Sequence, residues 1–140
     1  MKIQTIASLV LIIVTAFAAN SFSKEEVYKD YTDIGTIEGT KIPIEEIFQN
    51  KDKYHREIII IEGKLSEIKF KNLVGGKKFT LFIIEDDYGN NINVYARGTV
   101  EGLEEGTNIR VYGRYSKSKK FFFNKYKNVV KAKKIQMNSL

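Results

Sequence analysis

Two segments in the second half of the chain alternate apolar and polar residues one by one, and this period of two constrains the fold most strongly. Successive side chains of a β-strand point to opposite faces of a sheet, so such a strand has one face for a core and one for solvent. We therefore predict strands at Asn91–Arg97 and Thr107–Tyr115. Their expected inward positions are Ile92, Val94 and Ala96 in the first, and Ile109, Val111 and Gly113 in the second.

The longest apolar segment, Arg56–Phe70, predicts the first strand of the same sheet. It holds four successive isoleucines at 58–61, then Gly63, and its apolar phase changes after that glycine. A glycine with a change of phase predicts a coiled strand with a bulge. Because a long bent strand can pair at both of its ends, we expect a closed barrel, which also removes exposed sheet edges.

The remaining elements are short. Pro43, two acids in the following turn and apolar residues at 44, 47 and 48 predict a short amphipathic helix just before the first strand. The second strand is expected at Lys78–Glu85, with Phe82 and Ile84 inward. Turns or loops are expected at 71–77, 86–90, 99–106 and 116–120, and a last strand within 121–135 that is broken near 124–128, with Val130, Ala132 and Ile135 inward. The fold class is thus all-β, a five-stranded barrel with one short N-terminal helix.

The amino terminus carries the signs of export. A basic tip, an apolar run from Ile3 to Ala19 and small residues after it predict a signal peptide at 1–23. The alternative is a membrane anchor, but a span needs about 20 strongly apolar residues, and polar residues dilute this run. We expect a leader at 24–43, one domain at 44–135 and a tail at 136–140, with the product periplasmic or secreted and without a stable membrane span after cleavage.

Cysteine is absent from the chain, and His55 is its only histidine. The absence of cysteine excludes a lipid-anchored lipoprotein, disulfides, Fe–S clusters and thiolate zinc sites. A site built on several histidines is excluded as well. The nine Phe, eight Tyr and many Ile and Val residues supply a core, and we expect neither a metal nor a cofactor.

Positive charge is concentrated in the second half of the chain. Residues 24–63 hold 6 basic and 10 acidic residues, whereas residues 64–140 hold 16 basic and 7 acidic ones. Such asymmetry points towards nucleic acids, anionic glycans or an acidic protein surface, although it also serves solubility alone.

Aromatic and cationic residues interleave on the expected outer face of the barrel. A ring offers a π-face to a base or a sugar, and arginine binds phosphate or carboxylate. Lysines in the two expected basic loops would extend this surface into a positive groove across the sheet. The alternative is that tyrosine and arginine simply suit exposed strand positions. The candidate ligand-binding residues are Tyr95, Arg97, Arg110, Tyr112 and Arg114 on strands, and Lys77, Lys78, Lys117, Lys119 and Lys120 in the loops.

The other side of the second strand carries a second apolar row, Phe79, Leu81 and Ile83. An exposed apolar row would contact a protein or a hydrophobic ligand. We expect the helix or the leader to cover it instead, because the leader has nowhere else to pack. The run 121–123 of three phenylalanines is expected to be a strand with alternate rings buried.

The acidic pairs Asp86–Asp87 and Glu104–Glu105 are the only candidates for catalysis. Paired carboxylates can hold Ca²⁺ or serve hydrolysis. Such a site needs carboxylates and arginines that converge from several strands, and both pairs lie in expected turns, where acids are common. We therefore predict that the chain is not an enzyme.

The order of these elements resembles the OB fold. The resemblance rests on the lead-in Ile44–Tyr54, the apolar strand with Gly63, the hairpin Phe82–Val94 with its acidic glycine turn, and the segment Leu103–Arg114. The chain is similar to tRNA-anticodon-binding-like and single-strand-binding OB domains, and to small exported OB-fold proteins of bacteria, over roughly 44–135.

This resemblance implies a binding surface across strands two and three, between the connections of strands one to two and four to five. Family members bind oligonucleotides, oligosaccharides or proteins there. We expect a non-catalytic, exported binding module for an anionic oligomer such as single-stranded nucleic acid or an oligosaccharide. A periplasmic protein-interaction or envelope-stress module is the alternative, and a secreted OB-fold nuclease is a further one.

Overall fold

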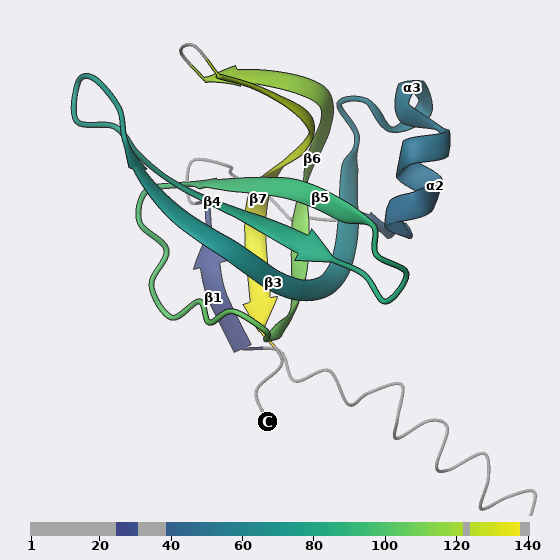
Figure 1. The fold of residues 1–140 in the computed structure, drawn as a ribbon, viewed down its shortest axis with the longest axis horizontal. Coiled ribbons are helices and arrows are strands. Elements are labelled where there is room, and N and C mark those ends of the chain that lie inside the picture. Colours follow the sequence, from purple (N-terminus) through teal and green to yellow (C-terminus); the bar gives the residue numbers. More distant parts are fainter. Residues whose placement is uncertain (1–24, 31–38, 122–123, 138–140) are drawn as a thin grey trace, which may run out of the picture.

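The computed structural model describes residues 25–30, 39–121 and 124–137 (Figure 1). Five of its strands form the body of the protein: β3 Ile58–Asn72, β4 Lys78–Glu85, β5 Asn91–Arg97, β6 Asn108–Phe121 and β7 Asn124–Met137. The pairing runs β3–β4–β5–β7–β6 and returns to β3, so the sheet closes on itself. All these pairs are antiparallel except β5–β7, which is parallel. This ring confirms the predicted all-β barrel of five strands.

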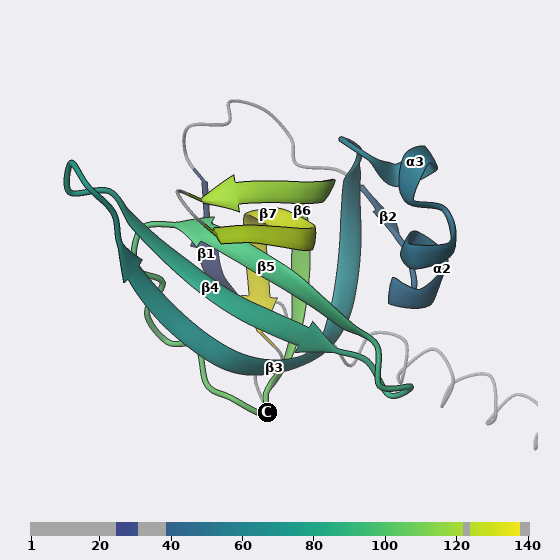
Figure 2. The same ribbon diagram turned by 45° about the horizontal axis from the view of Figure 1, so that its top comes forward.

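Four shorter elements complete the described chain. β1 (Glu25–Lys29) pairs with β7, and β2 (Thr40–Lys41) pairs in parallel with β3. The helices α2 (Ile44–Gln49) and α3 (Lys51–Tyr54) follow at one end of the barrel, as Figure 2 shows. The described parts of the leader therefore pair with β7 and β3 rather than with β4.

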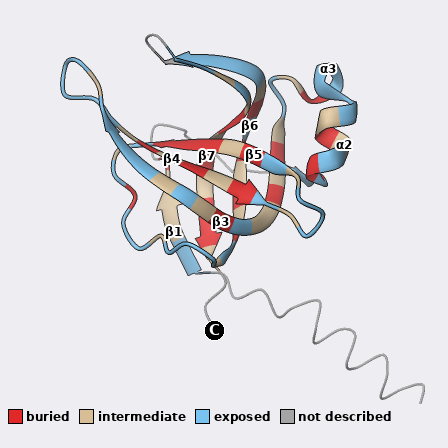
Figure 3. Cartoon of the chain, in the orientation of Figure 1, coloured by how far each residue is buried: buried red, intermediate tan, exposed pale blue. Residues whose placement is uncertain are grey.

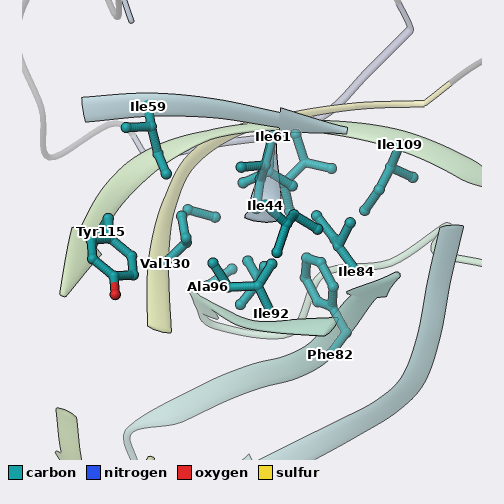
Figure 4. Packing of buried hydrophobic residues seen from close by; sticks show 14 of the residues in the cluster. Ile44, Ile59, Ile61, Phe82, Ile84, Ile92, Ala96, Ile109, Tyr115 and Val130 are labelled. Atoms are coloured by element: carbon teal, nitrogen blue, oxygen red, sulfur yellow. The ribbon is translucent and has the colours of Figure 1, made fainter. Parts of the chain in front are cut away.

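The barrel encloses one apolar core. Inward residues from all five strands meet there, and Ile44 and Ile47 of α2 and Tyr54 of α3 pack against them (Figures 3 and 4). Every inward position predicted from alternation belongs to this core or is buried: Phe82, Ile84, Ile92, Val94, Ala96, Ile109, Val111, Gly113, Val130, Ala132 and Ile135. The alternation of apolar and polar residues therefore predicted the correct inward face on every strand to which it was applied.

The bulge of β3 and its glycine lie at different positions. The register against β4 shifts between Ser66 and Lys69, where Glu67 has a positive φ of 51°, so the bulge lies after Gly63 rather than at it. Gly63 serves a close approach instead. A Cβ atom placed there would lie 2.5 Å from the Glu85 carbonyl oxygen and 2.7 Å from Cγ2 of Ile84.

The carboxy-terminal half differs from the prediction. Residues 116–120, expected as a basic loop, belong to β6, and β7 is unbroken from Asn124. Ser118 lies opposite Lys127, and Lys119 lies opposite Tyr126, so a long hairpin extends beyond the barrel. Both faces of this hairpin are polar, which hides a strand from an alternation pattern. Phe122 and Phe123 lie outside the described residues.

The predicted signal peptide at 1–23 and its apolar run also lie outside the described residues. Within the part of the chain that the structure describes, no helix has the length and apolar character needed to cross a membrane.

We predict that Gly63→Ala lowers the free energy of unfolding by about 2 kcal/mol, because the added methyl group must displace the β4 backbone. The adjacent Lys64 is exposed, so Lys64→Ala is the matched control, with an expected change below about 0.5 kcal/mol. Urea denaturation measures both. Equal stability of the two variants would contradict the close approach at Gly63.

Candidate ligand-binding groove

A groove of about 630 Å³ lies on the outer face of β4 and β5. The start of β4 and the end of β5 form its floor, and the tip of the β3–β4 hairpin and the β6–β7 hairpin border it. In Figures 1 and 2 both hairpins extend towards the same side of the barrel. The lining residues are Gly76, Lys77, Lys78, Phe79, Tyr95, Arg97, Gly98, Lys119 and Lys131.

Strand register places the floor residues side by side. Phe79 of β4 lies opposite Arg97 of β5, and Tyr95 lies opposite Lys131 of β7. Residues opposite one another in a ladder share a face of the sheet, so rings and cations alternate across three strands. The Phe79 and Tyr95 rings are tilted by 59° with centroids 6.1 Å apart, which is a favourable aromatic arrangement.

Tyr95 is the most enclosed of the candidate residues. Its neighbours Val94 and Ala96 belong to the core cluster and Tyr95 does not, so its side chain lies on the outer face as predicted. It is nevertheless only 6% exposed, because Phe79 and the groove walls cover it. Burial raises the pKa of the Tyr95 hydroxyl, although nearby Arg97 opposes the shift. The phenol therefore stays neutral, and Phe79 is the more open of the two rings at the groove.

The cationic rim is held by the backbone around Gly98. The Gly98 amide donates to the Lys78 carbonyl at 2.7 Å, and the buried Thr80 hydroxyl donates to the Gly98 carbonyl at 2.8 Å. The Val100 amide in turn donates to the Thr80 hydroxyl oxygen at 2.9 Å. Gly98 has φ = 79°, a conformation that glycine adopts without strain. These bonds fix the neighbouring Arg97 and Lys78 at the groove.

The β6–β7 hairpin is anchored where it leaves the barrel. The buried Tyr115 hydroxyl donates to Oδ1 of Asn128 at 2.6 Å, and Asn128 has a positive φ of 52°. On the other side, the Lys117 amide donates to Nδ1 of His55 at 3.1 Å, and Lys117 Nζ lies 2.6 Å from Oδ1 of Asp52. The hydrogen bond from Lys117 and its charge lower the pKa of the Asp52 carboxyl. The hairpin is thereby held in position to present Lys119 to the groove.

Five of the ten predicted ligand-binding residues line this groove: Lys77, Lys78, Tyr95, Arg97 and Lys119. The other five do not. Arg110 lies on a different face, where its Nε and Nη2 atoms are both 2.7 Å from Oε1 of Glu62, and Lys41 Nζ lies 3.0 Å from Oε2. Burial on its own would raise the pKa of Glu62, but the hydrogen bonds from Lys41 and Arg110 outweigh it and lower that pKa. Arg110 is thus part of an ion-pair network within the protein.

Tyr112 and Arg114 are also engaged within the protein. Lys134 Nζ lies 4.7 Å from the Tyr112 ring centroid, and the Tyr112 hydroxyl donates to Oε1 of Gln136 at 3.4 Å. Arg114 donates from Nη1 to the Arg56 carbonyl at 2.9 Å. Lys117 pairs with Asp52, and Lys120 is exposed on the hairpin outside the groove lining. The single surface predicted across the second to fourth barrel strands is therefore divided between two faces, because β7 separates β5 from β6.

The apolar row of β4 is partly open rather than covered. Phe79, Leu81 and Ile83 are all half-buried, and a smaller pocket of about 120 Å³ lies along the row. Leu81, Ile83, Asn93 and Tyr126 line that pocket together with Glu67, Lys69 and Phe82. The leader strand β1 pairs with β7, and residues 31–38 of the leader lie outside the described residues, so cover of the row by the leader stays a prediction. The β4–β5 face thus runs from a cationic groove to a more apolar pocket.

One residue of each acidic pair accepts backbone amides. Oδ1 of Asp86 accepts the amides of Tyr88 and Asn90 at 2.9 and 2.8 Å, and Oδ2 accepts the Asn90 side-chain amide at 2.9 Å. Oε1 of Glu105 accepts the Ile68 amide at the β3 bulge, at 3.3 Å. Asp86 and Asp87 also line a pocket of about 380 Å³ with Glu62, away from the groove. Among the described residues, no group of three or more side chains is arranged to hold a metal ion.

Lys131, Phe79, Gly76 and Gly98 line the groove but were absent from the predicted set. The sequence placed Phe79 in an apolar row of the second strand, and its contact with Tyr95 was not predicted. Lys131 reaches the site only because β7 pairs in parallel with β5, a contact between segments more than 30 residues apart that no local pattern reveals.

Comparisons with known proteins support the fold. No family model matches the chain, and no curated protein matches its sequence. One similar solved structure is described as a "putative aspartyl-tRNA synthetase" from Leishmania major Friedlin, with a TM-score of 0.56 and 14% identity over 95% of this chain. The chain spans 27% of the length of that protein. This likeness shows an OB-like fold for the chain.

We predict that Glu62→Gln lowers the free energy of unfolding at neutral pH by about 1–2 kcal/mol, because it weakens charged hydrogen bonds from two cations. Since the pKa of Glu62 is lowered in the folded state, its contribution is complete above the reference value of 4.5 and is lost as the pH falls through the lower, folded pKa. The difference from the parent should therefore shrink in acid. Urea denaturation over an acid-to-neutral series measures it, and a difference that did not change with pH would contradict this prediction.

The exposed Glu57 on the approach to β3 offers a matched control. Glu57→Gln should change the stability by less than about 0.5 kcal/mol at neutral pH.

Proposed function

We propose that this chain is an exported, non-catalytic OB-like binding module that holds an anionic oligomer, specifically a single-stranded nucleic acid, in the groove on β4 and β5. The observation that carries this proposal is the composition of the lining. Two tilted rings, Phe79 and Tyr95, lie among five cations, and no carboxylate is among the lining residues. A base can stack on the half-buried Phe79 ring, which packs against Tyr95, while its phosphates meet the cations.

The size of the groove supports an oligomer. About 630 Å³ is in the range of pockets that enclose a compact organic ligand, so it holds a unit of nucleotide size. The face continues along the same strands to the pocket beside Leu81, Ile83 and Tyr126. Successive residues on one face of a strand are about 6.8 Å apart, so a chain lying along β4 and β5 meets a new pair of side chains at each such step.

The fold agrees with this use. OB folds bind oligonucleotides and oligosaccharides on the face formed by barrel strands two and three, between the connections of strands one to two and four to five. β4 and β5 are those strands here, and the two bordering hairpins are those connections. The similar solved structure carries a name that refers to a tRNA synthetase. Fold likeness alone does not choose the ligand, so the lining residues decide the proposal.

The absence of catalysis is proposed from the same lining. General acid–base chemistry needs a carboxylate, an imidazole or a comparable group at the reacting atoms. The lining residues of the groove include neither a carboxylate nor His55, whose Nδ1 accepts the Lys117 amide. The carboxylates of Asp86 and Glu105 accept backbone amides in turns and at a bulge. Export is proposed from residues 1–23 alone.

We predict that the protein binds a fluorescent single-stranded oligonucleotide and that log affinity falls with log salt by about 0.7 for each phosphate neutralised. Arg97→Ser and Lys119→Ser should each weaken binding and reduce that slope by about 0.7, because each removes one groove cation. Lys64→Ser removes the same charge on β3 away from the groove and should leave the slope unchanged. Fluorescence anisotropy at several salt concentrations measures all four proteins.

Two outcomes would contradict the proposal. One is no binding of single strands at low salt. The other is an equal loss of affinity in the Lys64→Ser control. That result would mean that the overall charge of the protein, and not the groove, attracts the oligonucleotide. Titration with an anionic oligosaccharide distinguishes the two kinds of oligomer. Tighter binding of the oligosaccharide would show that the ligand is a glycan and not a nucleic acid.

A further inference from the structure

The tip of the β3–β4 hairpin carries exposed apolar side chains. Val74 is 84% exposed and Phe70 is 58% exposed. The third large apolar residue exposed in the described chain is Tyr88, at 87%, and it lies in the β4–β5 turn at the other end of β4. Two of the three are therefore on one projecting hairpin, which is pale blue, for exposed, at the left of Figure 3. Exposed apolar residues gathered at one place mark a contact surface.

Backbone hydrogen bonds hold these side chains away from the barrel. The Leu73 amide donates to the Lys77 carbonyl at 2.7 Å, and the Gly76 amide donates to the Leu73 carbonyl at 3.2 Å. Gly75 and Gly76 take positive φ values of 89° and 78°, which suit a tight turn. The strands below the turn are paired up to Asn72 and Lys78. Val74 therefore lies at the end of a paired arm, where it cannot fold back onto the core.

The apolar tip is distinct from the groove. Phe70 lies opposite Thr80 in the ladder, whereas Lys71 lies opposite Phe79, the ring on the groove floor. Neighbouring positions of a strand face opposite sides, so Phe70 points away from the face that carries the groove. Neither Phe70 nor Val74 is among the groove-lining residues. A ligand in the groove would leave both of them exposed.

The same hairpin is strongly basic. Lys69, Lys71, Lys77 and Lys78 are all exposed, and no acidic residue occurs from 68 to 84. A surface that receives this tip must therefore be apolar at the centre, where Val74 enters, and anionic around it. An anionic lipid bilayer has that arrangement, with hydrocarbon below a layer of negative head groups.

We propose that the β3–β4 hairpin tip docks on anionic membrane surfaces, with Val74 and Phe70 entering the lipid and the four lysines lying among the head groups. A bilayer is favoured over a nucleic acid because Val74, the most exposed tip residue, is aliphatic and offers no ring on which a base could stack. Lys77 and Lys78 also line the groove, so a bound anion would compete for them, but the proposal does not depend on what the groove ligand is.

The chain contains no tryptophan, so a single tryptophan can report on one position in the full-length protein. Val74→Trp places the reporter at the tip, and Tyr88→Trp is the matched control at an equally exposed position at the far end of β4. Both are mixed with vesicles of phosphatidylcholine and phosphatidylglycerol, and with vesicles of phosphatidylcholine alone. We expect a blue shift of the emission, and quenching by brominated lipid, for Trp at 74 with the anionic vesicles only.

The Tyr88→Trp control also tests whether the apolar amino-terminal run, and not the hairpin tip, brings the whole protein to the vesicles. Such recruitment does not bury position 74 in preference to position 88. Equal shifts at both positions, or no shift at 74, would overturn the proposal. A shift at 74 with oligothymidylate but not with vesicles would also overturn it and would assign the tip to the nucleic-acid site instead.

The lysines are tested on the Val74→Trp background by titrating anionic vesicles. Lys71→Ser should weaken binding about fivefold, since one lysine near an anionic surface contributes about that factor. Lys64→Ser removes the same charge from β3 beyond the bulge and should leave the Trp signal at 74 unchanged. The same loss for both variants would mean that overall charge, and not the tip, drives the contact.

Discussion

The parallel pairing of β5 with β7 is the contact on which the rest of the structure depends. The antiparallel pairs alone would give one open sheet in the order β5–β4–β3–β6–β7, with β5 and β7 at its edges. The three paired positions from Asn93 to Tyr95, opposite Val129 to Lys131, close the ring and seal the core. The same pairing places Lys131 beside Tyr95 and sets the β6–β7 hairpin next to the outer face of β4 and β5. The contact that closes the barrel therefore also forms the groove.

Much of the barrel could be predicted from local patterns. The strands at Lys78–Glu85 and Asn91–Arg97 have the expected bounds, because turn-forming residues such as Gly76, Asp86 and Gly89 flank them. The inward phase was correct because a slip of one residue would place isoleucine and valine in water. The face of the sheet that carries the groove, with Tyr95 and Arg97 on it, followed from this phase, whereas Lys77, Lys78 and Lys119 were predicted from the basic loops.

The remainder depends on contacts between distant segments. The β6 extension through Lys119 carries no apolar alternation, and it is stabilised by pairing with β7 and by the bond from Tyr115 to Asn128. Arg110 and Tyr95 look alike in the sequence, each an outward residue of a strand. Only the order of strands shows that Arg110 faces Glu62 while Tyr95 faces Lys131 and the groove. Charge pattern alone cannot separate a cation that pairs internally from one that is presented to a ligand.

In the proposed function, the cations and rings of β4, β5, the β6–β7 hairpin and Lys131 act together as one binding surface. Amide chemical-shift mapping during titration with a single-stranded oligonucleotide tests it most directly, because each residue reports separately. Shifts should gather at Lys77–Phe79, Tyr95–Gly98, Lys119 and Lys131, with Arg110 and Tyr112 unaffected. Shifts centred on Arg110 and Tyr112, or spread evenly over all basic residues, would contradict it.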